Sequence, residues 1–255
     1  MKRRNMRRGA APALKPGQIE YEFGIPIAGQ ILERSQWAAT ALKRLPEAGP
    51  VDWGATFGRS APLVVDIGCG NGRYTLGSAV ERPNCNHLAA DSLPAVVRYG
   101  TRRANQRGLG NVRFAVCDGW RLLHDYCAPE SIAEIHIYHP QPYADPNKAN
   151  LRMLTPDFMV LMLNRLASDG RVFLQTDRLA YWQYMDQAMR ALCDWHQVVE
   201  GWPDEPEFRS RREILARKQG LTIYRGWGRK HSDRTDEQLT AIASELEMPM
   251  FEVEP

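Results

Sequence analysis

The sequence predicts an α/β fold in which a doubly wound, mostly parallel sheet carries helices on both faces. Two observations lead to this fold class. From residue 62 onward short apolar runs alternate with amphipathic segments, and the first apolar run ends in a glycine-rich loop. Strands and helices that alternate at this spacing are typical of an open parallel sheet. The 255 residues, 44% of them hydrophobic and 25% charged, can bury the core of one large domain.

The expected strands are short apolar runs that carry no helical periodicity, as buried parallel strands usually do. They lie at 63–67, 87–91, 112–116, 132–138 and 171–176, with two later ones near 195–200 and 221–225. Helices are expected at 35–45, 72–81, 119–127, 156–168, 178–193 and 232–247, and one runs from Ser92-Leu93-Pro94 to about Gly108. Residues 46–62 are expected to form a loop.

Three regions differ in composition. Residues 1–20 are basic and rich in Pro and Ala, which predicts a flexible arm; 21–230 form a single domain with an N-terminal extension, and 231–255 a helical tail. No run approaches the roughly 18 apolar residues of a membrane span, and the N-terminus lacks the apolar stretch of a secretory signal. Five scattered cysteines without a CxxC pair predict no metal site and a reducing compartment. We therefore expect a cytoplasmic protein, as a monomer or a homodimer.

Basic residues are clustered, although the formal net charge is only +3. Five of the first eight residues are Lys or Arg, and nine basic residues fall between Arg209 and Arg234. A third group repeats at helical spacing: Arg98, Arg102, Arg103 and Arg107. Each cluster alone is compatible with solvated surface, but the three together favour an anionic partner.

The glycine-rich loop, DIGCGNG, runs from Asp66 to Gly72 at the end of the first buried strand. Glycines let the backbone turn sharply and approach a ligand without a Cβ atom in the way. Dinucleotide-binding loops have the spacing GxGxxG, whereas here it is GxGxG, with Arg73 where the third glycine would fall. Asp66 also puts a carboxylate where a diphosphate would bind. A cationic ligand suits this place better, such as the amino group of S-adenosylmethionine.

Two further acids follow the next two strands. Asp91 ends the second strand, where a carboxylate can accept both ribose hydroxyls of an adenosine, and Asp118 follows the third strand and can face the adenine amino group. The alternative is that Asp66 caps a turn and Asp91 caps a helix. The three positions together favour a cofactor site, which is made of Asp66, Gly68, Gly70, Gly72, Asp91 and Asp118.

With these residues placed, the chain resembles the bacterial tRNA (guanine-N7)-methyltransferases from about residue 63 to 220. These are Rossmann-like class I methyltransferases that modify guanosine 46 in the tRNA variable loop. The family has a PDPWPKKRHHKRRLxxP block after its fourth strand, a Thr-Asp pair after the fifth, and TxxE followed by a glycine near the C-terminus. The matching residues are His139-Pro140-Gln141-Pro142-Tyr143, Arg152 with Pro156, Thr176-Asp177, and Ser210, Glu213 and Gly220.

The chain departs from the family inside that block. Gln141 stands where the family has Asp, and Tyr143 stands where it has Trp. The Lys/Arg/His-rich segment has become ADPNKAN at 144–150, so that a catalytic His of the family falls on Lys148.

The resemblance implies transfer of a methyl group from S-adenosylmethionine to N7 of guanosine 46, with tRNA as partner and S-adenosylhomocysteine as product. It implies Gln141 and Asp177 as catalytic residues, and as substrate-binding residues Tyr143, Lys148, Arg152, Asp177, Ser210 and Glu213. Carboxylates suit the guanine N1–H and N2 amino donors, and Tyr143 offers a face for stacking.

Several alternatives stay open. Asp177 can instead cap the following helix, and Glu213 can be a surface acid among arginines. The protein can be a methyltransferase of the same fold that acts on another RNA, a small molecule or a protein. It can also be a non-catalytic tRNA-binding relative that lost turnover through Gln141 and Lys148, although the retained Asp66, glycines and Asp91 argue against this.

Overall fold

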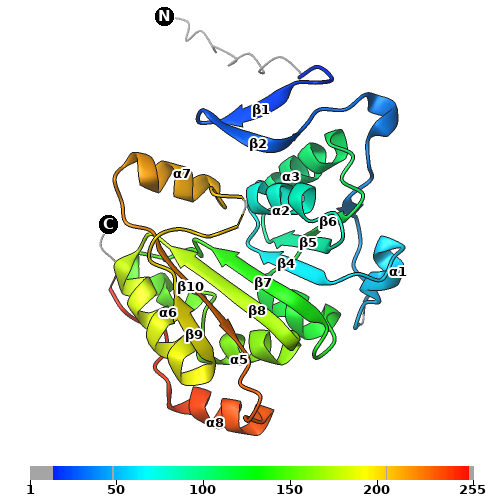
Figure 1. The fold of residues 1–255 in the computed structure, drawn as a ribbon. Coiled ribbons are helices and arrows are strands. Elements are labelled where there is room, and N and C mark those ends of the chain that lie inside the picture. The colour runs from blue at the N-terminus through cyan, green and yellow to red at the C-terminus, as the bar shows by residue number, and fades with distance from the viewer. Residues whose placement is uncertain (1–13, 48, 205, 253–255) are drawn as a thin grey trace, which may run out of the picture.

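One central sheet organises the part of the chain that this computed structural model describes, residues 14–47, 49–204 and 206–252 (Figure 1). In those residues the sheet has eight strands in the order β3-β6-β5-β4-β7-β8-β10-β9. The first six in that order run parallel, and β10 runs antiparallel to both β8 and β9. Their bounds are β3 (Ala41–Leu42), β4 (Leu63–Ile67), β5 (Asn86–Asp91), β6 (Val112–Val116), β7 (Ile132–Tyr138), β8 (Leu166–Thr176), β9 (Asp194–Gln197) and β10 (Tyr224–Arg229).

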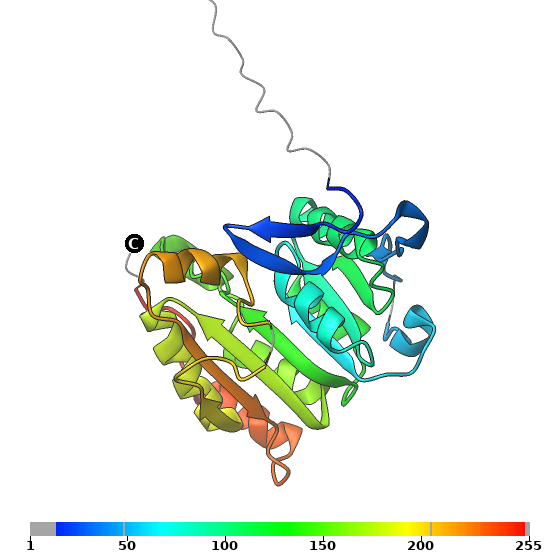
Figure 2. The same ribbon diagram turned by 45° about the horizontal axis from the view of Figure 1, so that its top comes forward.

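Helices cover both faces of the sheet (Figures 1 and 2). α2 (Arg73–Glu81) and α3 (Pro94–Gln106) lie on one face, and α5 (Pro156–Arg165), α6 (Leu179–Leu192) and α8 (Asp236–Glu245) lie on the other. Side chains alternate between the faces, so Val64 packs with Tyr74 of α2 while Val65 joins the cluster of Phe158 from α5. The predicted doubly wound α/β fold is therefore confirmed.

A β-hairpin precedes the sheet and lies over α2 and α3 (Figure 2). β1 (Ile19–Glu22) and β2 (Ile25–Gln30) pair antiparallel on either side of Phe23-Gly24. Of the predicted flexible arm, residues 1–13 lie outside the described residues, and Ile19 and Glu20 already belong to β1. The last two residues of the predicted arm thus belong to the hairpin, because β1 pairs with β2.

An ion-pair cluster ties this hairpin to α3. The Glu20 carboxylate accepts hydrogen bonds from Arg103 Nε (3.0 Å) and Nη2 (2.8 Å) and from Arg107 Nη2 (3.1 Å). Both arginines are almost completely buried. Burial raises the pKa of Glu20, but the hydrogen bonds and charges of the two arginines outweigh it, so the net shift of that pKa is downward.

The predicted helix at 35–45 is wrong. This segment contains only the short 3₁₀ helix η1 (Arg34–Gln36) and the edge strand β3. Thr40, between them, is fixed by contacts distant in sequence: its N–H and hydroxyl donate to Asn105 Oδ1 at 2.9 and 2.8 Å, and its carbonyl accepts from Phe114 N at 2.8 Å. These contacts pull the chain into the sheet edge. The expected loop at 46–62 also contains the five-residue helix α1 (Trp53–Phe57), which Asp52 caps.

The later elements follow the prediction with shifted boundaries. The predicted helix at 119–127 is α4 (Gly119–Arg121) continued by the π-helix η2 (Leu122–Tyr126), and α8 confirms the predicted C-terminal helix. β8 begins five residues earlier than expected, and β10 three residues later. Besides α1, two helices were not predicted, η3 (Pro146–Leu151) and α7 (Arg211–Lys218). α7, of sequence RREILARK, has no continuous apolar stripe and buries chiefly Glu213, Ile214 and Ala216.

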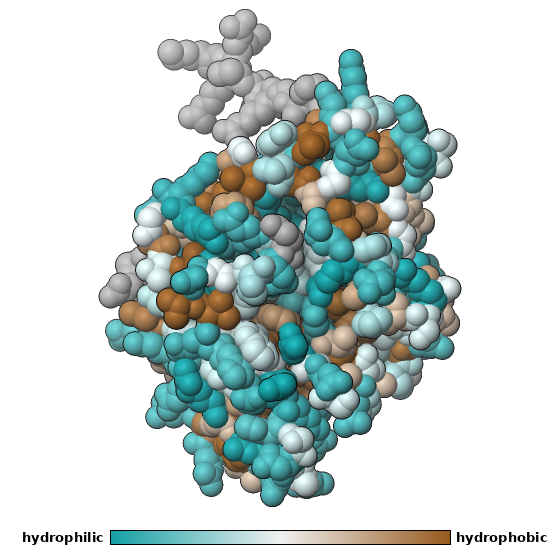
Figure 3. Space-filling view, viewed as in Figure 1, coloured by the Kyte–Doolittle hydropathy of each residue, from teal (hydrophilic) through white to brown (hydrophobic). Residues whose placement is uncertain are grey.

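Hydrophilic residues dominate the face shown in Figure 3, and hydrophobic ones form separate small groups there. Among the described helices we find none with the length and apolar composition that crossing a bilayer would require. All five cysteines are buried and unpaired, so they pack as small hydrophobic side chains.

The Glu20 cluster makes a prediction for stability. Glu20→Gln is expected to lower the free energy of unfolding by about 3 kcal/mol, because two buried guanidinium groups lose their carboxylate partner. Urea denaturation followed by circular dichroism measures this change. Glu33→Gln, an exposed change in the same segment, is the control and is expected to stay within about 0.5 kcal/mol of the wild type. Equal stability of the two variants would contradict the role of Glu20.

Candidate active site

A cavity of about 510 Å³ opens where β4, β5, β6 and β7 end. Open parallel sheets bind their ligands in this position, outside the carboxyl ends of the strands. The lining residues come from all four strand ends and the loop after β7: Ile67, Gly68, Asp91, Ser92, Leu93, Cys117, Asp118, Gly119, Ile137, Tyr138, His139, Pro140, Gln141, Tyr143, Leu151 and Met153. Five of the residues predicted from the sequence thus share one cavity: Gly68, Asp91, Asp118, Gln141 and Tyr143.

The glycine-rich loop between β4 and α2 forms one wall of this cavity. Gly68, Gly70 and Gly72 have φ values of +70°, +53° and +78°, a region that favours glycine. A Cβ atom on Gly68 or Gly70 would meet nothing within 4 Å, whereas one on Gly72 would lie 2.7 Å from the Phe114 ring. Gly72 is therefore required for packing against the sheet, and the other two leave open space above the loop.

Asp66 lies beneath the loop rather than in the cavity. It is 4% exposed, and the Thr75 hydroxyl donates to its Oδ2 at 2.5 Å. Burial, together with the charge of Asp91, raises the pKa of Asp66 to about 7, although the hydrogen bonds from Thr75 oppose the shift. A carboxyl group with this pKa changes its charge near neutral pH.

Asp91 joins the loop to the second strand. Its Oδ2 accepts from Gly70 N at 3.0 Å, and its Oδ1 accepts from Leu93 N at 2.9 Å just before α3. The sequence left open whether this acid faces a ligand or caps a helix. In the structure it lines the cavity and also accepts both backbone bonds, while α3 begins after Leu93 without a side-chain cap. Asp118 is similar: it lines the cavity and caps α4 by accepting from Arg121 N at 2.9 Å.

The loop after β7 forms the opposite wall. His139 and Tyr143 both have positive φ, +55° and +43°, which is costly for residues with a Cβ atom. His139 N donates to Gln175 O at 2.7 Å, so the β7–β8 pairing continues to this point before the chain turns. The turn brings His139, Gln141 and Tyr143 to the cavity.

Arg152 has a different place from the predicted substrate contact. It is 2% exposed, and its guanidinium donates to the carbonyls of Pro142 (2.7 Å) and Tyr143 (3.0 Å), and to those of Pro249 and Phe251 near the C-terminus. These bonds use its donors inside the protein, so Arg152 holds the cavity loop in shape. Lys148 also lies away from the cavity, exposed on η3 with Asp145 at 3.8 Å.

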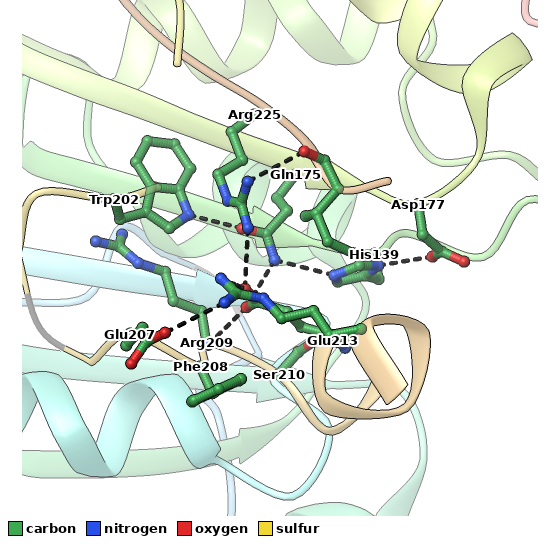
Figure 4. Close-up of polar contacts among 12 residues, drawn as sticks. His139, Gln175, Asp177, Trp202, Glu207, Phe208, Arg209, Ser210, Glu213 and Arg225 are labelled. Carbon is green, nitrogen blue, oxygen red and sulfur yellow. Dashed lines mark hydrogen bonds and ion pairs between the residues drawn. The ribbon is translucent and has the colours of Figure 1, made fainter. Parts of the chain in front are cut away.

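Asp177 follows β8 and lies beside His139, as Figure 4 shows. His139 Nδ1 donates to its Oδ1 at 2.8 Å, and Arg212 of α7 forms a two-pronged ion pair with both carboxylate oxygens. Burial raises the pKa of Asp177, but the bonds from His139 and Arg212 outweigh it and hold that pKa well below its usual range. The helix-cap alternative is wrong, because α6 begins without a side-chain cap.

Glu213 is fully buried, so it is not a surface acid. Its carboxylate accepts from Gln175 Nε2 (2.9 Å), Arg209 N (2.8 Å), Arg217 Nη2 (2.7 Å) and Arg225 Nη2 (3.2 Å), as Figure 4 shows. Burial raises its pKa, but these four donors outweigh it and lower the pKa overall. With both oxygens occupied, Glu213 does not present the free acceptor that the sequence suggested.

Two further residues, Ser210 and Gln175, are hydrogen-bonded to Glu213. Ser210, expected at the substrate, caps α7 by accepting from Glu213 N at 3.0 Å. Gln175 was not predicted, yet its amide bridges His139 Nε2 (2.9 Å) and Glu213. Strand alternation puts Gln175 and Asp177 on the same side of the chain, so their spacing by two was a signal available in the sequence.

The geometry and the comparisons with known proteins agree. The solved structure of the 16S rRNA methyltransferase KamB shares the fold, with a TM-score of 0.51 and 12% identity over 75% of this chain and 98% of that one. A family model described as "Putative methyltransferase" matches residues 60–225. Fold and site define a class I methyltransferase. The tRNA (guanine-N(7)-)-methyltransferase of Bordetella parapertussis is 31% identical over 215 residues, which are 83% of this chain and 84% of that protein. The chain belongs to the tRNA (guanine-N7)-methyltransferase family.

A second relative supports the same assignment. The tRNA (guanine-N(7)-)-methyltransferase of Halorhodospira halophila is 31% identical over 177 residues, which are 67% of this chain and 77% of that protein. The resemblance stated from the sequence motifs is therefore confirmed.

The buried Asp66 makes a prediction about pH. Its pKa is about 7 in the folded protein and 3.8 in the reference state, so folding retains a proton that the unfolded chain releases. Stability therefore falls as the pH rises through this range and levels off above about 7. The cofactor-free wild type is expected to lose up to a few kcal/mol at this group between pH 5 and pH 8.

Asp66→Asn is expected to lose much less stability over the same interval, because the amide imitates the protonated acid. Urea denaturation at both pH values measures the difference, and Asp169→Asn, an exposed change, is the control that keeps the wild-type dependence. Parallel pH profiles for wild type and Asp66→Asn would show that another group is responsible.

Proposed function

We propose that this protein transfers the methyl group of S-adenosylmethionine to N7 of guanosine 46 in the variable loop of tRNA. The observation that carries the proposal is the cavity at the strand ends, where the glycine loop faces His139, Gln141 and Tyr143. Membership of the tRNA (guanine-N7)-methyltransferase family supports the choice of base and RNA. The predicted cytoplasmic location belongs to the same proposal.

The residues around the glycine loop fit the cofactor. Open space lies above Gly68 and Gly70, and a cavity of about 510 Å³ is large enough for a nucleoside. Asp91 would accept the ribose hydroxyls, Asp118 would face the adenine, and Asp66 beneath the loop would favour the cationic amino group. When bound, S-adenosylmethionine supplies an electrophilic methyl group on a sulfonium.

The remaining residues have a positioning task. Guanine N7 carries a lone pair and no proton, so its attack needs no general base. Rate enhancement then comes from holding the base in line and from the electrostatics of the site. Tyr143 offers a face for stacking an extruded base, and Gln141 an amide that orients it.

Asp177 lies behind His139 of the cavity wall and its side chain is only 3% exposed, so it would accept the guanine donors through an exchange of partners. Its carboxylate is paired with Arg212, whose side chain is 37% exposed on the first turn of α7. An entering guanine would take over one oxygen as Arg212 turns outward to the RNA. Glu213, with four internal donors and no exposed surface, anchors α7 rather than contacting the base.

The direct test is a transfer assay. The protein is incubated with methyl-labelled S-adenosylmethionine and total tRNA, and the RNA is digested to nucleosides. Label in 7-methylguanosine is expected. Label in another nucleoside or in protein would favour a methyltransferase with a different substrate. Salt-sensitive tRNA binding without any label would favour a non-catalytic relative.

Substitutions test the base contacts. Asp177→Asn is expected to slow methyl transfer about tenfold or more, since a lost base contact is worth about 1–3 kcal/mol. It is expected to leave cofactor affinity unchanged, because Asp177 does not line the cofactor cavity. Asp169→Asn, at the other end of β8, is the control and is expected to keep full activity. Full activity of Asp177→Asn would remove this acid from the mechanism.

The departure at Gln141 gives a second pair of variants. Gln141→Ala is expected to reduce the rate less than Asp177→Asn, because an exposed amide contributes one orienting contact. Gln141→Asp restores the acid of the family block and is expected to raise the rate. Single-turnover rates at saturating cofactor measure both effects, and a slower Gln141→Asp enzyme would contradict the orienting role.

A further inference from the structure

A second cavity, of about 560 Å³, lies between α3 and the chain segment that contains β3. The segment from β2 to α1 passes beside α3 in both ribbon views (Figures 1 and 2). Four basic side chains line this groove, those of Lys43, Arg98, Arg102 and Arg121, and no acidic residue is among its described lining residues. We refer to it as the basic groove.

The arginines of α3 divide into two pairs of opposite character. Arg103 and Arg107 are buried and paired with Glu20 of the hairpin. Arg98 and Arg102, also four residues apart, lie on another side of the helix and are exposed. Within the described chain neither makes a hydrogen bond or an ion pair. Their charges are therefore left for a partner outside the protein.

The wall opposite α3 adds to this charge. Lys43 is exposed and, like Arg98, is unpaired within the described residues. Arg121 is 58% exposed, although Asp125 at 3.4 Å neutralises part of its charge. Leu42, Leu45 and Val116 contribute apolar surface between the cations. Charged and apolar patches that alternate match a sugar–phosphate chain better than a single inorganic anion.

The groove adjoins the candidate active site. Leu93 of the active-site cavity lies one turn before Val97 of the groove, and Cys117 of the cavity follows Val116 of the groove. Asp118, which lines the cavity, accepts the hydrogen bond of Arg121 N. A polymer can therefore occupy the groove while one of its bases enters the cavity.

The other basic cluster offers less free charge. Arg209 and Arg225 are buried, and Arg212 and Arg217 are paired with Asp177 and Glu213. The basic residues from Arg209 onward are one of the three clusters in the sequence that favour an anionic partner, but few of them are free to bind one. Most of their charge neutralises acids inside the protein.

We propose that the basic groove binds the phosphate backbone of the RNA substrate, with Arg98 and Arg102 as its main contacts. This inference rests on the proposed function, because the RNA is the one whose guanine enters the neighbouring cavity. It assigns the RNA a second binding surface on the cofactor side of the molecule.

The test uses Arg98→Gln/Arg102→Gln in the full-length protein. We expect its Kd for tRNA to rise about tenfold at low salt. We also expect the slope of log affinity against log salt to become shallower by about 1.4 to 1.8, the value for two lost phosphate contacts. Affinity for S-adenosylmethionine and the circular dichroism spectrum are expected to stay unchanged, since both side chains are exposed and outside the cofactor cavity.

Arg190→Gln/Arg229→Gln is the matched control. It removes two exposed charges from α6 and the end of β10 and is expected to keep the wild-type Kd and salt slope. If Arg98→Gln/Arg102→Gln also keeps them, the groove is not an RNA site. A free nucleotide is the other possible occupant. In that case guanosine monophosphate binds the wild type, and the double variant loses this binding but keeps its affinity for tRNA. That result would overturn the proposal. A wild type that binds no tRNA overturns both this inference and the proposed function, which the nucleoside assay tests separately.

Discussion

The buried carboxylate of Glu213 is the interaction on which the arrangement of the site depends. A charge without solvent is very costly unless hydrogen bonds surround it, and here four donors do so, from Gln175, Arg209, Arg217 and Arg225. They belong to β8, β10, α7 and the segment before α7. Since α7 has no apolar stripe of its own, this shared carboxylate, rather than hydrophobic packing, holds the helix against the carboxyl edge of the sheet.

The same network sets the protonation of His139 and Asp177 at the candidate active site. The indole N–H of Trp202 can only donate, and it donates to Gln175 Oε1 at 2.6 Å, so the amide nitrogen of Gln175 faces Glu213 and His139. His139 Nε2 must then accept, which puts the ring hydrogen on Nδ1, toward Asp177. Asp177 is kept ionised by this donor (Figure 4) and by Arg212 of α7. Gln175 and Trp202, which do not line the cavity, thus decide which groups beside the cavity carry charge.

Helical spacing decides which of the arginines of α3 are buried in ion pairs and which are exposed. A helix turns about 100° per residue, so four arginines within ten positions face different surroundings. Arg103 and Arg107 face the hairpin and serve stability, while Arg98 and Arg102 face solvent over the basic groove. Net charge and clustering alone do not separate these roles, since a formal net charge of only +3 does not reveal the local excess of positive charge next to the candidate active site.

The sequence by itself determined the parallel strands and the cofactor-type loop, because each depends on local patterns. The run LVVDI is apolar at four of its five positions, with Asp66 as the exception, and the spacing of Gly68, Gly70 and Gly72 fixes a turn within five residues. Only the tertiary structure decided that 35–45 joins the sheet edge, that α7 exists, and that Arg152 and Glu213 are internal rather than free for substrate. Those outcomes depend on hydrogen bonds between residues that lie 10 to 99 positions apart in the sequence. A charged side chain in a sequence shows what it can bind, but whether that capacity remains free depends on which opposite charges the fold brings beside it.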